Sequence, residues 1–287
     1  MNCARFAANT CRRLPLPPRA GLACYRQLAR LMAPSLEESV ETLSGRRVFL
    51  ITSTGRTGTT WLASLLNRVH DCHVVHEPLP VEQCAHFDAL QDPDTAEDYL
   101  TTFRLRETAW RLLNDRSNVY GEVNGALRRH VGPLRALVPQ IQVIHLIRNP
   151  RDVIISMLNR AALTASDRVY FRLDHPVGIG RVEWSRMDRF ERLCWLWSAD
   201  NAILREQSDG RAVFEDITRD PESFRAQILE PLSLELNDAV WREHVQVRQN
   251  ATQRRETQHE CWTPRQEEIF RRMVGPELEN YSCYAGS

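Results

Sequence analysis

The sequence contains no lysine, and its 37 basic residues are all arginines. Acidic residues also number 37, so the formal net charge is zero and the composition indicates no bulk attraction to nucleic acid or an anionic membrane. No apolar run is long enough to span a bilayer. The eight cysteines form no C-x-x-C pair, a spacing typical of zinc and redox sites. We therefore expect free thiols, no metal, no integral membrane segment and no nucleic-acid partner, and a cytoplasmic location.

Acidic residues are absent from the first 36 positions, which carry six arginines. An Arg-rich, acid-poor start is one feature of an organellar transit segment. The prolines within Leu14–Pro18 break any long helix, however, and favour a partly disordered extension that leads into a helix over Leu22–Met32. We predict an extension over residues 1–45 and one domain over residues 46–287.

The rest of the chain alternates short apolar runs with amphipathic segments. The apolar runs predict strands over residues 47–52, 72–76, 118–123, 142–147 and 212–214. The amphipathic segments predict helices over residues 59–69, 95–113, 128–138 and 183–206. This alternation is typical of the α/β class. We predict a single P-loop-type domain with a central parallel sheet, helices on both faces, and a ligand site beyond the carboxyl ends of the strands.

The first predicted strand leads directly into a glycine-bearing loop and a helix, in the segment Ser53–Trp61. Its backbone N–H groups and the helix N-terminus suit an anion, and glycine lets the backbone approach the ligand closely. The loop differs from the G-x-x-x-x-G-K-[ST] loop of nucleoside triphosphatases. Ser53 stands at the position of the first glycine, and Thr59 stands at that of the lysine. The sequence therefore predicts a phosphate site of another kind.

A second strand-to-helix junction carries further anion-binding side chains. The strand predicted at Gln142–Ile147 is followed by Arg148, and Ser156 comes eight residues later in the next helix, which begins near Pro150. A guanidinium pairs with phosphate through its forked donors, and a hydroxyl adds a further hydrogen bond.

The two junctions together resemble the signatures of the sulfotransferase family, whose loop ends in S-G-T-T-W or R-S-G-T-T. The resemblance covers Arg47 to Tyr284 and is firm at these two motifs. It implies that the loop holds the 5′-phosphosulfate of 3′-phosphoadenosine 5′-phosphosulfate (PAPS) and that Arg148 and Ser156 hold its 3′-phosphate. Trp61 is expected either to stack on adenine or to lie in the core. The residues implied to bind PAPS are Gly55, Arg56, Thr57, Gly58, Thr59, Thr60, Trp61, Arg148 and Ser156.

The resemblance implies metal-independent, in-line transfer of a sulfuryl group from PAPS to an acceptor hydroxyl or amine, with a carboxylate as general base. Arg56 is expected to stabilise the charge on the bridging oxygen, since its high pKa prevents it from donating a proton. Glu77, just past the second strand, is the first candidate for the base. His76 is a further candidate, although strand geometry points it to the opposite face. Glu122 and His130 are the other candidates.

The acceptor is expected to be a small molecule or a glycan. The resemblance places it against the segments 79–94 and 161–187, with Tyr170, Phe171 and Trp184 nearby. The segment Gln253–Thr257 resembles a loop that closes over the nucleotide. Two other functions stay open: a P-loop kinase or nucleotide hydrolase, which needs a loop lysine and a magnesium-binding aspartate, and a non-catalytic nucleotide-binding module.

Overall fold

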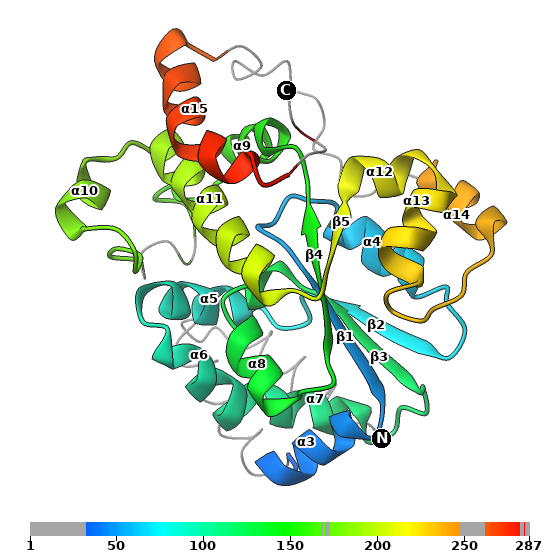
Figure 1. Ribbon diagram of the computed structural model, residues 1–287. Helices are drawn as coiled ribbons and strands as arrows, with labels where there is room; N and C mark the ends of the chain where they lie inside the picture. Colours follow the sequence, from blue (N-terminus) through cyan, green and yellow to red (C-terminus); the bar gives the residue numbers. More distant parts are fainter. Residues whose placement is uncertain (1–32, 168, 170–172, 247–261, 282–283, 285–287) are drawn as a thin grey trace.

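The computed structural model describes residues 33–167, 169, 173–246, 262–281 and 284 of the chain (Figure 1). Its centre is a parallel sheet of five strands in the order β2-β3-β1-β4-β5. The strands are β1 (Arg47–Thr52), β2 (Cys72–His76), β3 (Val119–Val123), β4 (Gln142–Ile147) and β5 (Gly210–Val213). The predicted α/β class and parallel sheet are confirmed.

Helices connect the strands and cover both faces of the sheet (Figure 1). Before β3 they are α3 (Leu36–Ser44), α4 (Thr59–Leu66), α5 (Glu82–Gln91), α6 (Asp94–Tyr99), the π-helix η1 (Leu100–Arg104) and α7 (Leu105–Leu112). Between β3 and β5 they are the 3-10 helix η2 (Gly125–Leu127), α8 (Val131–Leu137), α9 (Pro150–Leu158), α10 (Arg181–Arg186) and α11 (Arg189–Gln207). After β5 they are α12 (Phe214–Arg219), α13 (Pro221–Phe224), the π-helix η4 (Arg225–Leu229), α14 (Asp238–Val245) and α15 (Pro264–Leu278).

Side chains of β1 alternate between two cores, because successive residues of a strand point to opposite faces. Phe49 and Ile51 pack with α4, α13 and α14 on one face. Val48 and Leu50 pack with α3, η1, α7 and α8 on the other. A third core joins α9, α11 and α15 beside the end of β4. The sheet is thus buried on both sides, and its carboxyl-terminal edge is where loops meet.

The sequence prediction differs from the structure at three helices. The helix predicted over residues 183–206 is wrong as a single element, because Asp188 caps α11 through a capping box with Glu191 and separates it from α10. The helix predicted over 95–113 exists but contains the π segment η1. The helix predicted from residue 128 begins as α8 at Val131, after the 3-10 turn η2.

The predicted N-terminal extension is described only from residue 33 onward. Its last part forms α3, whose Leu43 is buried in the core shared with β1 and α7. Arg106 of α7 donates from Nε to the Pro34 carbonyl at 2.7 Å, which ties this segment to the domain. The helix predicted over Leu22–Met32 lies outside the described residues. Among the described helices none has the length and apolarity to cross a membrane, and the described cysteines Cys72, Cys84 and Cys194 are free thiols.

Three histidines are buried as neutral groups. Burial lowers the pKa of His130 to about 3, lowers the pKa of His145 to about 4, and lowers the pKa of His86 well below its usual range. An unfolded chain binds protons on these side chains below about pH 6.5, whereas the folded chain does not. Their stabilising contribution is therefore complete above that pH and is lost as the pH falls.

We predict that the free energy of unfolding falls between pH 6.5 and pH 4, and that His130→Leu makes this fall shallower. The change in slope is about 1.4 kcal/mol per pH unit, which is the effect of one proton. Urea unfolding at several pH values measures it. The exposed His70 provides the control variant His70→Gln, which leaves the slope unchanged. Burial raises the pKa of Glu82 to about 7, which changes the free energy of unfolding with pH in the opposite direction. This contribution is present in both proteins, so it cancels when the slope of the variant is compared with that of the wild type. An unchanged slope in His130→Leu contradicts the prediction.

Candidate active site

The two predicted phosphate-binding junctions meet at the carboxyl-terminal edge of the sheet. β1 and β4 are adjacent parallel strands, so the loops that follow them start side by side. Arg148 donates from Nη1 to the Arg56 carbonyl at 3.0 Å, and Arg56 donates from Nε to Ser156 Oγ at 2.9 Å. Residues 92 and 100 positions apart in the chain therefore form one cluster.

The loop between β1 and α4 adopts the left-handed conformation at three positions. Gly55 has φ 87°, Arg56 has φ 59° and Gly58 has φ 82°. Successive turns of this kind direct backbone N–H groups into one concave surface that suits an anion. Arg56 is strained there because it carries a side chain, and such strain is concentrated at functional sites. Thr57 Oγ1 donates to the buried Ser53 Oγ at 2.7 Å and fixes the base of the loop.

Phe214, the first residue of α12, lies against both phosphate junctions. A Cβ at Gly58 would overlap its ring, and the Arg148 guanidinium stands over the same ring at 5.1 Å from the centroid. The next residue, Glu215, accepts the backbone N–H of Asn149 at 3.0 Å and so holds the start of α9. The sequence analysis predicted only a strand over residues 212–214 here, and the segment supports both sides of the site.

Positive charge is concentrated around the loop. Burial lowers the pKa of Arg56, the charges of Arg160 and Arg148 lower it further, and Glu77 opposes them. Arg56 still carries its charge, since arginine does not deprotonate in proteins. Arg148 is held in part by Asp152 at 3.2 Å, and its buried Nε has no hydrogen-bond partner among the described residues. An anion between these guanidinium groups removes their repulsion.

Two adjacent residues at the end of β2 reach the loop. His76 Nε2 lies 2.9 Å from Thr59 Oγ1 and 3.5 Å from Thr60 Oγ1, at the start of α4. Glu77 takes φ 37° and turns away from the strand. A Cβ at Gly125 would lie 3.5 Å from Glu77 Oε1 and 3.2 Å from the Ser53 carbonyl, which places the carboxylate beside the end of β1.

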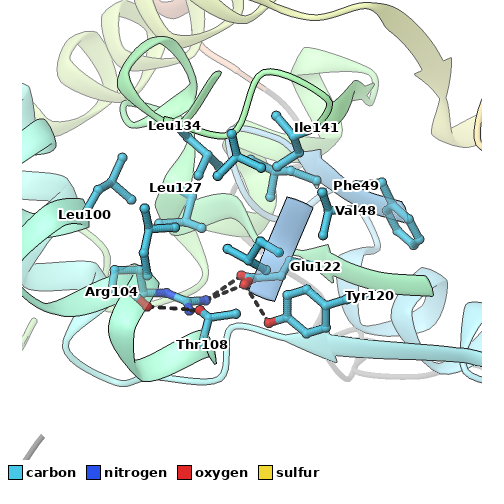
Figure 2. Close-up of a pocket in the computed structure, with 14 residues that line it drawn as sticks. Val48, Phe49, Leu100, Arg104, Thr108, Tyr120, Glu122, Leu127, Leu134 and Ile141 are labelled. Carbon is cyan, nitrogen blue, oxygen red and sulfur yellow. Dashed lines mark hydrogen bonds and ion pairs between the residues drawn. The ribbon is translucent and has the colours of Figure 1, made fainter. Parts of the chain in front are cut away.

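Glu122 is engaged in a buried ionic network on the other side of β3 (Figure 2). Arg104 donates to both of its carboxylate oxygens, at 2.7 and 2.6 Å, and the Tyr120 hydroxyl donates to Oε1 at 2.7 Å. Arg104 also donates to Glu82 at 2.6 Å. A cavity of about 30 Å³ lies beside the network, and its apolar walls come from the core under α3, α7 and α8. The carboxylate oxygens of Glu122 therefore already accept hydrogen bonds from buried side chains.

Two other sequence candidates also lie in the core. His130 is 0% exposed, neither ring nitrogen has a hydrogen-bond partner among the described residues, and its ring packs edge-on against Tyr99. Trp61 is 6% exposed, and its indole packs against Phe214 and His244. Stacking of Trp61 on adenine would require these neighbours to move.

The segments predicted to border the acceptor contact each other. The backbone N–H of Asp174 donates to Gln91 Oε1 at 2.6 Å, and that of Val177 donates to the Leu90 carbonyl at 2.8 Å. Trp184 is 2% exposed and belongs to the third core. Tyr170, Phe171 and the segment Gln253–Thr257 lie outside the described residues. In the part of the chain that the structure describes, no cluster of His, Cys, Asp and Glu has the arrangement of a metal site.

A sequence model of the sulfotransferase family matches residues 49–238, which is more than half of the chain. The chain belongs to the sulfotransferase family. Sulfuryl transfer is the reaction of this family, and the matched region contains both phosphate junctions. No curated protein matches the chain in sequence.

Solved sulfotransferases resemble the chain at low identity. The enzyme of Alicyclobacillus acidocaldarius is 15% identical, with a TM-score of 0.48 over 83% of this chain and 95% of that one. STF9 of Mycobacterium avium is 13% identical, with a TM-score of 0.49 over 96% and 90%. Mouse SULT7A1, solved in complex with PAP, is 14% identical, with a TM-score of 0.47 over 88% and 92%.

We predict that Gly58→Ala destabilises the protein by about 3 kcal/mol or more. The methyl group would overlap the Phe214 ring at a left-handed backbone position that alanine disfavours. Thermal and urea unfolding measure the loss. Gly210→Ala is the matched control, because nothing lies within 4 Å of a Cβ there and alanine loses less conformational entropy than glycine in a strand such as β5. This control keeps or raises the stability. Equal stability of both variants argues against the packing of Gly58 on Phe214.

Proposed function

We propose that this sulfotransferase uses PAPS as its donor and transfers the sulfuryl group, without a metal ion, to a hydroxyl or amine of a small molecule or glycan. The observation that carries the proposal is the convergence of Arg56, Arg148 and Ser156 at adjacent strand ends. PAPS carries a 5′-phosphosulfate and a 3′-phosphate. The three residues come from the strand-to-helix junctions after β1 and β4, and each junction would bind one of these groups.

The residues present fit such a donor. The loop offers backbone N–H groups and the Arg56 guanidinium to the 5′-phosphosulfate. Arg148 and Ser156 offer a guanidinium and a hydroxyl to the 3′-phosphate. The Arg148 Nε is buried without a hydrogen-bond partner among the described residues and lies 4.0 Å from Glu215 Oε1, so a phosphate oxygen can accept the hydrogen bond it does not yet make. Arg160, just past α9, adds positive charge beside Arg56, and the sequence interpretation missed it.

PAPS supplies an activated sulfuryl group whose bond to the 5′-phosphate breaks as the bond to the acceptor oxygen or nitrogen forms. Arg56 and the loop N–H groups stabilise the negative charge that the bridging oxygen gains. The Glu77 carboxylate takes the proton that the acceptor loses. Its left-handed backbone and its position near the end of β1 support this role over Glu122 and His130, which lie in the core.

The acceptor side of the proposal rests on the contact between the segments 79–94 and 161–187. Glu77 immediately precedes the first of them, so an acceptor bound along these segments would bring its nucleophile to the carboxylate. A screen of phenols, monosaccharides, oligosaccharides and amines with labelled PAPS identifies the acceptor class.

We predict that PAP raises the melting temperature of the protein in the absence of magnesium, and that Arg148→Ala weakens PAP binding by roughly tenfold to a hundredfold. The variant loses a charge-assisted contact to phosphate. Thermal shift and calorimetry measure both effects. Arg68→Ala is the control, since Arg68 pairs with Glu243 on the surface beyond the end of α4. Stabilisation by ATP that depends on magnesium, with none by PAP, would refute the proposal.

We predict that Glu77→Gln lowers turnover of the acceptor found by the screen by about a hundredfold or more and leaves PAP affinity within about twofold. The amide keeps the shape of the side chain but cannot accept the proton. Steady-state kinetics and calorimetry give the two values. The exposed Glu243→Gln provides a carboxylate control. Full turnover in Glu77→Gln assigns the base to another group.

A further inference from the structure

The imidazole of His76 occupies a defined position beside the phosphate loop. Its Nε2 lies within 2.9 Å of the Thr59 hydroxyl and 3.5 Å of the Thr60 hydroxyl. Thr59 and Thr60 are the first two residues of α4, and the backbone N–H groups of a helix's first turn have no partner within the helix. The sequence analysis named His76 as a candidate base that strand geometry points to the opposite face, and its contact with the loop was not predicted.

The direction of this hydrogen bond decides what Thr59 can do. If Nε2 accepts the Thr59 proton, that hydroxyl cannot donate to an anion. If Nε2–H donates to Thr59 Oγ1, the hydroxyl proton remains available for a phosphate oxygen. When a chain of hydrogen bonds ends on an anion, each donor points its proton toward the negative charge. Each hydrogen bond in the chain is then strengthened by the others. The arginine side chains around the loop indicate that the anion binds there.

We propose that His76 is a positioning residue, which donates from Nε2 to Thr59 Oγ1 and thereby aims the Thr59 hydroxyl at the 5′-phosphate group of the bound nucleotide. The inference rests on the proposed function and adds a residue outside both phosphate signatures. Burial lowers the pKa of His76 while Glu77 opposes the shift, so the ring is neutral near pH 7 and has one N–H to donate.

The test uses two nucleotides that differ at one group. PAP carries both a 3′- and a 5′-phosphate, whereas adenosine 3′-monophosphate lacks the 5′-phosphate. His76→Phe keeps a ring of similar size without a donor, and we expect it to weaken PAP binding about fivefold with no effect on adenosine 3′-monophosphate. His76→Gln, whose amide nitrogen can take the place of Nε2, restores PAP affinity to within about twofold of the wild type.

A double-mutant cycle with Thr59→Val tests whether His76 acts through Thr59. In the Thr59→Val background, His76→Phe causes no further loss of PAP affinity, because the hydroxyl it positions is gone. His73→Gln is the matched control on the same strand, since His73 pairs with Asp115 away from the loop. Calorimetry on the full chain provides all affinities, and the control variant binds PAP as the wild type does.

Several results overturn the inference. These are unchanged PAP affinity in His76→Phe, an equal loss for both nucleotides, and an equal further loss in the Thr59→Val background. Each of them leaves the proposed function intact if the wild type binds PAP. A wild-type protein that does not bind PAP overturns the proposed function and this inference with it.

Discussion

The repulsion among guanidinium groups at the carboxyl ends of β1 and β4 is the constraint that governs this site. Arg56 and Arg148 are joined through a backbone carbonyl and face the charge of Arg160, while Glu77 supplies part of the compensation. Asp152 and Glu215 pair with Arg148, and Ser156 and the Phe214 ring contact the two guanidinium groups, so the cluster is held in place without a ligand. In the proposed function, a phosphate group that enters this arrangement relieves the repulsion at a site that is already organised.

The absence of lysine changes how a phosphate loop can work. A lysine is a compact charge that can lose its proton, whereas arginine keeps its charge and offers a planar fork of donors. In the proposed function, proton transfer therefore falls to the carboxylate of Glu77 at the end of β2, and not to the cation of the loop. The separation of charge stabilisation from proton transfer divides the site between the loop after β1 and the end of β2.

Much of the fold could be predicted because the strands are short apolar runs bounded by glycine, proline or charged residues. The strands at 47–52 and 142–147 have the predicted bounds, since a parallel sheet buries them on both faces. The break between α10 and α11 was missed because the Asp188 capping box lies inside a continuous amphipathic pattern. Phe214 was missed, and His76 was predicted as a candidate base without its contact to the loop. The reason is related: both contacts come from tertiary packing, which periodicity does not encode.

The π-helical turn Leu100–Arg104 determines which residues of α7 face the sheet. A π turn holds one residue more than an α turn, and each residue rotates an α-helix by about 100°. Loss of a single residue before Arg104 would restore regular α geometry but rotate Arg104 away from Glu82 and Glu122, with which it pairs in the core. The segment can therefore vary in composition at the half-buried Thr101 and Thr102 but not in length, because its register is fixed by the ion pairs of one buried arginine.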